Sequence, residues 1–283
     1  MKTILRTFVG CTAILFGTAC MGAVKYVPEN MKVELSLKVP GNNAVNYKLH
    51  PDKLENSYFD YEWRSDNKLP ITVFHKVEER DSCMRLTVQL TAAQDVYFNY
   101  RQLLSTGYRH DNCQFYMPGF WYRRNLRSPK KAPSFHTSDS WLVREDRLSA
   151  PLTGIFSEKE KRFMTVNRLD DFSMDALATH KEGEIILSGK TSLGFTGFEN
   201  QQGIAMLSFG FPYREAPKSY IRKLTLAPEV EAFQLMKKGE SVLLTWEIME
   251  SGADDFSDFI QHTWEHCYDT YVPKPVENSY SIA

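Results

Sequence analysis

Short runs of alternating apolar and polar residues constrain the fold of this chain more than any other feature of its sequence. In residues 31–39 and 84–90, apolar and polar side chains alternate along the run. A period of two places the apolar side chains on one face of an extended strand, where they can be buried. Similar short runs, rich in Val, Ile, Phe and Tyr, predict further strands at 58–63, 71–77, 96–100, 152–156, 162–166, 184–188, 204–209, 221–226, 230–236 and 241–249.

These strands predict an all-β fold. No long helical pattern separates them, so a parallel sheet wound by βαβ units is not expected. About a dozen antiparallel strands indicate a large two-sheet β-sandwich, which we place at residues 24–252. Hydrophobic residues make up 42% of the 283 residues, a content that suits a packed core and excludes a disordered chain.

One amphipathic helix is predicted near the C-terminal end, within residues 254–271. Asp254 and Asp255 suit its N-terminal turn, and Pro273 ends it. Residues 253–283 are therefore expected to form this helix and a linker stub. Its apolar side chains recur at helical spacing on one face and are Phe256, Phe259, Ile260, Thr263, Trp264, Cys267, Tyr268 and Tyr271.

Residues 1–23 are typical of an export signal peptide. Lys2 and Arg6 precede an apolar run that is too short to cross a bilayer. The small residues that follow allow cleavage by an ordinary signal peptidase. They also allow lipidation of Cys20, although Gly17 stands where a lipoprotein signal usually has Leu. We therefore expect an exported protein, in the periplasm or associated with the outer membrane.

Charge and cysteine content exclude two further classes. With 34 basic and 35 acidic residues, the chain carries a net charge of −1, which argues against a nucleic-acid partner. Five cysteines are too few for a disulfide scaffold. Two alternatives fit the sequence in the expected oxidising compartment. In one, Cys83 and Cys113 form a disulfide. In the other, Cys83, Cys113 and Cys267 are three buried free thiols.

The most unusual segment spans residues 117–129. It combines aromatic residues, whose faces can stack on sugar rings, with arginines, whose guanidinium groups bind carboxylates. This combination suits an acidic sugar. The same residues also fit a structural role. In that alternative, the aromatic residues of the loop fill the core and its arginines pair with nearby acids. The side chains concerned are Phe120, Trp121, Tyr122, Arg123, Arg124 and Arg127.

A second segment of mixed aromatic and charged residues spans 134–151. Trp141 and Arg144 are its candidate sugar contacts. Neighbouring arginine and acid residues most often pair with each other. Glu145 and Asp146 are not expected to form an acid–base pair, because neighbours in a strand point to opposite faces.

His262, Glu265 and His266 match the H-x-x-E-H pattern of one class of zinc peptidases. At helical spacing both histidines lie opposite the apolar stripe and are expected to face solvent. Few residues remain beyond the helix that could supply a third ligand, and Glu277 is the one acidic residue among residues 272–283. We therefore predict two solvated histidines, no metal site and no cofactor.

A series of motifs follows a recognisable order along the chain. The motifs occupy residues 117–125, 141–151, 192–195 and 211–215, followed by Tyr220, Trp264 and Pro273. This order resembles the N-terminal β-supersandwich of exported Bacteroidetes glycosidases of the six-hairpin type, the glucuronidase-like family 154. The resemblance implies a sandwich similar to galactose mutarotase, which in the family precedes a helical (α/α)6 barrel that carries the catalytic carboxylates.

The barrel has no counterpart in this sequence, so no catalytic residue is carried over. The resemblance implies a non-catalytic module of a polysaccharide-degrading glycosidase system, truncated before the barrel and able to contact acidic sugars. Trp264 and Tyr268 would contact a helical catalytic domain or a second protomer.

One alternative is a stand-alone mutarotase-like epimerase or lyase, which needs two histidines and a carboxylate to converge. A structural or oligomerisation domain is another. The remaining histidine candidates are scattered at positions 75, 110, 136 and 180.

Overall fold

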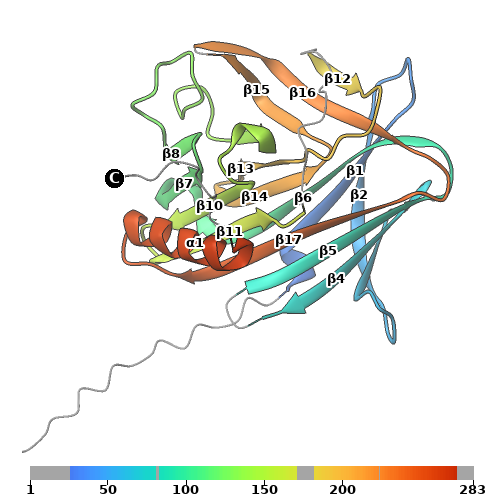
Figure 1. The fold of residues 1–283 in the computed structure, drawn as a ribbon, viewed down its shortest axis with the longest axis horizontal. Coiled ribbons are helices and arrows are strands. Elements are labelled where there is room, and N and C mark those ends of the chain that lie inside the picture. The colour runs from blue at the N-terminus through green and yellow to red at the C-terminus, as the bar shows by residue number, and fades with distance from the viewer. Residues whose placement is uncertain (1–25, 81–82, 171–181, 223, 273–283) are drawn as a thin grey trace, which may run out of the picture.

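Two β-sheets packed face to face make up most of the molecule (Figure 1). The predicted signal peptide with Cys20, the linker stub with Pro273, and His180 lie outside the described part of the chain. The computed structural model describes residues 26–80, 83–170, 182–222 and 224–272.

The first sheet carries the helix on its outer face. All its strand pairings are antiparallel. From one edge to the other its strands are β8 (Trp121–Arg123), β7 (Cys113–Met117), β10 (Leu152–Ser157), β11 (Arg162–Arg168), β17 (Ser241–Gly252), β5 (Cys83–Ala92), β4 (Ile71–Glu79), β3 (Tyr61–Arg64) and β2 (Val45–Lys53).

The second sheet begins at the same strand β2, which pairs with β1 as well as with β3 and so joins the two sheets. The long strand β6 pairs with β1, β14 and the end of β16. Within the described chain, β12 and β16 form the one parallel pairing. The strands are β1 (Met31–Lys38), β6 (Val96–Arg109), β14 (Ile204–Phe211), β13 (Phe195–Gln201), β9 (Trp141–Arg144), β15 (Arg214–Arg222), β16 (Thr225–Met236) and β12 (Gly183–Ile186).

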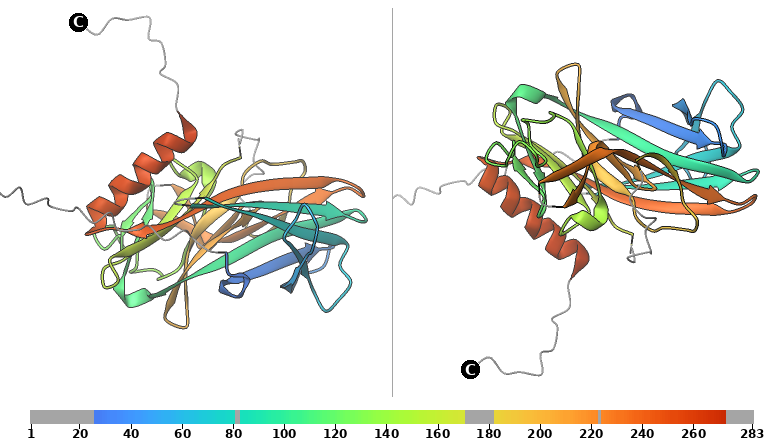
Figure 2. Two further views of the ribbon diagram at one scale, coloured as in Figure 1. Left: turned by 90° about the horizontal axis from the view of Figure 1, so that it is seen from below. Right: turned by 90° about the horizontal axis from the view of Figure 1, so that it is seen from above.

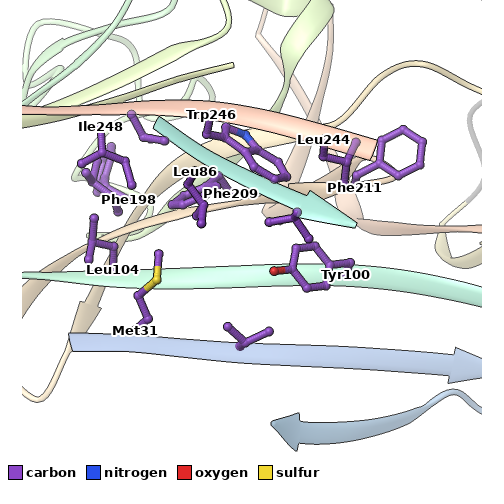
Figure 3. Packing of buried hydrophobic residues seen from close by; sticks show 14 of the residues in the cluster. Met31, Leu86, Tyr100, Leu104, Phe198, Phe209, Phe211, Leu244, Trp246 and Ile248 are labelled. Carbon is purple, nitrogen blue, oxygen red and sulfur yellow. The ribbon is translucent and has the colours of Figure 1, made fainter. Parts of the chain in front are cut away.

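Aromatic and aliphatic side chains from both sheets fill the space between them (Figure 3). The ring centroids of Trp246 on β17 and Phe209 on β14 are 5.2 Å apart. Phe115 on β7 stacks on Phe198 of β13 at 4.0 Å. All four rings are buried, and burying each contributes roughly 1.5–3 kcal/mol to stability.

The helix α1 (Phe256–Tyr271) packs on the outer face of the first sheet (Figure 2). Asp255 caps it by accepting hydrogen bonds from the backbone N–H groups of Ser257 and Asp258. The buried face of α1 meets Phe156 and Phe163, so a second hydrophobic cluster lies beneath the helix. Three short 3₁₀ helices complete the described secondary structure, at Pro28–Asn30, His110–Asn112 and Glu145–Arg147.

The structure confirms an all-β sandwich with one C-terminal amphipathic helix. The prediction of a strand at 221–226 is wrong, because the chain turns there between β15 and β16, with Leu224 in the left-handed region at φ 56°. Strands β2, β7, β8, β9, β13 and nearly all of β15 were not predicted from the sequence.

Among the residues that the structure describes, no helix has the length and apolar character needed to cross a membrane.

Candidate functional site

The two tryptophans of the predicted sugar site are core residues. Trp121 is 0% exposed and Trp141 is 1% exposed, and their ring centroids are 5.8 Å apart. The indole N–H of Trp121 donates to the carbonyl oxygen of Arg123 at 2.8 Å. No ring face is therefore open to a sugar, which corrects the prediction for both residues. The physical reason is that these rings anchor the surrounding loop to the sandwich.

Arg144 is also turned away from solvent. Its Nη2 donates to Asp146 Oδ2 at 2.9 Å, and its guanidinium lies over the ring of Tyr213. This pairing is the one expected for neighbouring arginine and acid residues, and it removes Arg144 from the candidate sugar contacts. Glu145 instead pairs with Arg168 at 2.7 Å, and both acids lie in the 3₁₀ helix Glu145–Arg147 rather than in the strand that the prediction assumed.

The remaining residues of the first segment do come together at the surface. A cavity of about 720 Å³ opens at the end of β8, a size within the range of small-molecule sites. Tyr122, half exposed, forms one wall, and three arginines follow it in sequence. The cavity, which we call the arginine cleft, is lined by Gln114, Tyr122, Arg123, Arg124, Asn125, Leu126, Arg127, Ser128 and Glu158.

Asn125 fixes the shape of the arginine cleft. Its side-chain oxygen accepts the backbone N–H of Tyr122 at 3.1 Å. Its Nδ2 donates to the carbonyl oxygens of Phe120 and Pro133, both at 3.2 Å. Arg123 and Asn125 adopt left-handed backbone conformations at φ 57° and 50°, which are uncommon for residues other than glycine. These contacts tie the loop together and leave Arg123 and Arg127 exposed, whereas Arg124 is half-buried with its guanidinium over the ring of Phe135.

The residues that line the arginine cleft carry an excess of positive charge. Arg123, Arg124 and Arg127 form no ion pair with a carboxylate of the described chain. Arg124 is held by the backbone carbonyl oxygens of Asp111 and Cys113. Three guanidinium groups around one cavity can bind a carboxylate by charge-assisted hydrogen bonds. Glu158 is the one acidic residue among those that line it, and it accepts from Gln114.

Sequence reasoning missed Gln114, Asn125 and Glu158. Asn125 lies within the segment singled out, but its role depends on a hydrogen bond back to Tyr122. Gln114 and Glu158 come from β7 and from the turn after β10, which pair side by side in the first sheet. The sequence carries no signal for this pairing.

The two histidines of the H-x-x-E-H pattern do not share a site. His262 lies 3.4 Å from Asp258 on its own helix. The Nε2 of His266 lies 2.7 Å from Oε1 of Glu247 on β17, so His266 faces the sheet. The prediction that both histidines face solvent is therefore wrong for His266. Burial alone would raise the pKa of Glu247, but the hydrogen bond to His266 lowers it to about 2.

The three cysteines of the described chain are free thiols, and all three are buried. The Cys83–Cys113 disulfide does not form, and the alternative with three buried thiols is the one present. Burial raises the pKa of Cys83 and of Cys267 to about 11 and that of Cys113 to about 12. None of the three is activated as a nucleophile.

Trp264 and Tyr268, the expected contacts to a partner domain, remain accessible on α1. Trp264 is 41% exposed, and its indole N–H donates to the hydroxyl of Tyr116 at 2.8 Å. Tyr268 is 65% exposed. Both side chains therefore keep part of their surface exposed on α1.

The histidines that an epimerase or lyase would need do not converge within the described residues. His75 is buried in the core between Tyr26 and Tyr100. The Nε2 atoms of His110 and His136 contact different backbone carbonyl oxygens, at 2.9 and 3.0 Å respectively. The arrangement expected for that alternative, two histidines with one carboxylate on a concave face, is not found there.

His75 gives the stability of the fold a pH dependence. Its Nδ1 lies 3.1 Å from the Tyr26 hydroxyl, its Nε2 lies 2.7 Å from the Tyr100 hydroxyl, and the ring of Trp63 lies beside it. Burial disfavours the charged imidazolium and lowers the pKa of His75 to about 3. In the unfolded chain a histidine titrates near pH 6.5, roughly. Below that pH the unfolded state therefore binds a proton that the folded state does not.

We expect the free energy of unfolding to fall as the pH is lowered from about 6 to about 4, with a contribution from His75 of up to about 1.4 kcal/mol per pH unit. A His75→Gln variant should lack this contribution, so its free energy of unfolding should fall less steeply as the pH is lowered. Urea unfolding at several pH values measures both slopes. Parallel slopes in the two proteins would contradict the assignment.

Comparison with known proteins assigns no family. No family model matches the chain, and no curated protein matches it. A solved polysaccharide lyase matches 83% of this chain over 27% of its own length, with 13% identity and a TM-score of 0.38. The Slr1438 protein of Synechocystis sp. PCC 6803 matches 76% of this chain and 73% of its own, with 7% identity and a TM-score of 0.39. An α-galactosidase of Lactobacillus brevis matches 79% of this chain and 29% of its own, with 8% identity and a TM-score of 0.28.

This chain therefore spans less than a third of the length of the lyase and of the galactosidase. TM-scores this low do not establish a shared family. The resemblance to family 154 stays a prediction.

Proposed function

We propose that this chain is a non-catalytic β-sandwich module that binds acidic saccharides, such as uronic acid-containing oligosaccharides, in the arginine cleft. It would act within an exported polysaccharide-degrading glycosidase system, in the periplasm or at the outer membrane. A helical catalytic domain or a second protomer would pack against Trp264 and Tyr268. The proposed family relationship is to the sandwich domains of six-hairpin glycosidases of the family 154 type.

The arginine cleft is the observation that carries this proposal. Arg123, Arg124 and Arg127 line one cavity with no carboxylate paired to them among the described residues, and Tyr122 offers an aromatic face beside them. A planar guanidinium binds a carboxylate through two parallel hydrogen bonds, and an aromatic face can stack on a sugar ring. The two features together match a sugar that carries a carboxylate.

The same cavity supports binding rather than catalysis. A glycoside hydrolase usually needs two carboxyl groups that flank the bond to be cleaved. Glu158 is the single acidic residue that lines the arginine cleft. A lone carboxylate beside three arginines can help to orient a saccharide, but it does not supply an acid and a base.

Binding of uronide oligosaccharides tests the proposal. We expect the full chain to bind them, and to bind the matching neutral oligosaccharides at least about tenfold more weakly, because a charge-assisted hydrogen bond contributes about 1.5–3 kcal/mol. The variant Arg123→Gln/Arg127→Gln, which changes two exposed side chains, should lower the affinity for uronides by about tenfold or more. Raising the salt concentration should weaken binding in the same direction. Isothermal titration calorimetry measures all three effects.

A control arginine is available near the opposite end of the first sheet. Arg64 on β3 is 58% exposed and pairs with Asp52 and Glu62, so Arg64→Gln removes an exposed arginine without touching the cleft. It should leave uronide affinity unchanged. Absence of uronide binding by the unmodified chain would end the proposal, and equal losses in the two variants would move the binding site elsewhere.

A further inference from the structure

Three side chains with metal-binding atoms meet beneath α1. The thiol of Cys83, a carboxylate oxygen of Glu247 and a ring nitrogen of His266 all lie within 4.8 Å of one another. Cys83 and Glu247 are 4% and 3% exposed. The His266 side chain is 21% exposed and gives the cluster an edge that solvent can reach.

Strand pairing and the helix bring the cluster together. Cys83 on β5 lies opposite Met249 on β17, and Glu247 is two residues before Met249. Side chains two apart in a strand share a face, so Cys83 and Glu247 are diagonal neighbours on the outer face of the first sheet. Since α1 crosses this face, it places His266 above them, with Nε2 2.7 Å from Glu247 Oε1.

The surrounding groups hold the carboxylate in place. Thr270 donates to Glu247 Oε1 at 3.2 Å. The guanidinium of Arg85 lies 3.6 Å from the other oxygen, Oε2. Arg85 therefore contacts the oxygen that does not face His266, and Oε1 remains directed at the imidazole.

We infer that Cys83, Glu247 and His266 form a zinc site that fastens α1 to the first sheet. Zinc prefers sulfur, nitrogen and oxygen ligands of these three types, and three protein ligands leave a fourth position for water. At the usual bond lengths, the ligand atoms around a tetrahedral zinc ion lie roughly 3.2–3.8 Å from one another. The three ligand atoms of the cluster lie within 4.8 Å of one another, so zinc binding needs shifts of about 1 Å in these distances. Binding releases the Cys83 thiol proton to solvent, and the proton that His266 Nε2 donates to Glu247 moves to Nδ1 or to solvent, so that the free lone pair of Nε2 binds the metal.

The site differs from the one that the H-x-x-E-H pattern suggests. That pattern would use His262 and His266 together, whereas His262 pairs with Asp258 along the helix. The structure uses His266 with two residues of the sheet instead. His262 is therefore a matched control, because it is a histidine one turn away on the same helix.

Cobalt binding to the metal-free full chain tests the site. We expect one equivalent of Co²⁺ to give a thiolate-to-cobalt charge-transfer band in the near ultraviolet and tetrahedral bands in the visible, both abolished by one equivalent of Zn²⁺. We expect His266→Gln and Cys83→Ser each to weaken Zn²⁺ binding by more than about 100-fold, since loss of even an outer-shell partner costs about 10–100-fold. His262→Gln should leave the affinity within about twofold.

Several outcomes would overturn the inference. Failure of the unmodified chain to give the charge-transfer band would do so without any variant, so the test does not depend on each variant folding. A band that persists in Cys83→Ser, or one that is lost in His262→Gln as fully as in His266→Gln, would assign the metal to other ligands. Circular dichroism of each variant confirms that the fold is intact before its affinity is compared.

Discussion

We expect Arg168→Leu to lower the free energy of unfolding by about 3–5 kcal/mol, because it leaves a buried carboxylate without its cation. Arg168 ends strand β11, and its Nη1 donates to Glu145 Oε2 at 2.7 Å. The two side chains are 3% and 0% exposed. The other contact to that oxygen is the backbone N–H of Gly194, at 2.8 Å. One neutral hydrogen bond cannot replace a cation in the sandwich interior.

A matched variant on the same strand separates burial from charge. Arg162 begins β11, is 47% exposed and pairs with Glu250 at 2.9 Å. Because exposed ion pairs contribute little, Arg162→Leu should cost about 1 kcal/mol or less. The double variant Glu145→Gln/Arg168→Leu should lose less than the sum of its two single variants, since no carboxylate is then left unpaired. Chemical denaturation provides all of these values. Similar decreases in the free energy of unfolding for Arg162→Leu and Arg168→Leu would contradict this account.

We expect Phe259→Ala to cost about 3–5 kcal/mol, because its ring is the main contact between α1 and the first sheet. Phe259 is 0% exposed and lies 5.0 Å from Phe163 and 6.0 Å from Phe156 between ring centroids. A Cβ atom at position 154 would lie 2.6 Å from its ring, so Gly154 leaves the space that the ring fills. Removing the ring opens a cavity that the surrounding strands cannot close.

Tyr268→Ala is the control on the same helix, because Tyr268 is 65% exposed. Its cost should stay within about 0.5 kcal/mol. Gly154→Val should reproduce part of the Phe259→Ala loss by pushing the ring out of place. Thermal denaturation gives the stability of each variant, and hydrogen exchange shows whether the protection of α1 is lost first. Unchanged stability in Phe259→Ala would show that other contacts hold the helix.

The sequence predicted strands well where one face of a strand is buried and the other is not. Strand β5 alternates buried and half-buried residues along most of its length, which gives the period of two that was recognised. Strand β7 is buried at every position. Its Phe115 faces the core between the sheets while Tyr116 faces the cluster under α1. The alternation disappears because both faces of β7 are covered, and the covering helix is distant in sequence.

The candidate site was predicted only in part for a related reason. Trp121 and Tyr122 are neighbours on the short strand β8, so they must point to opposite faces. The sequence placed both in one binding segment. The sheet decided that Trp121 enters the core and that Tyr122 borders the arginine cleft.

The sequence by itself determined the sandwich class and the helix with its Asp255 cap, because hydrophobic period and capping are local properties of the chain. Only the tertiary structure decided which side chains meet. Glu247 and His266 are 19 residues apart, and Gln114 and Glu158 are 44 apart. These pairs meet because strands pair and α1 crosses a particular face of the sheet. Such long-range packing leaves no periodic signal in a single sequence.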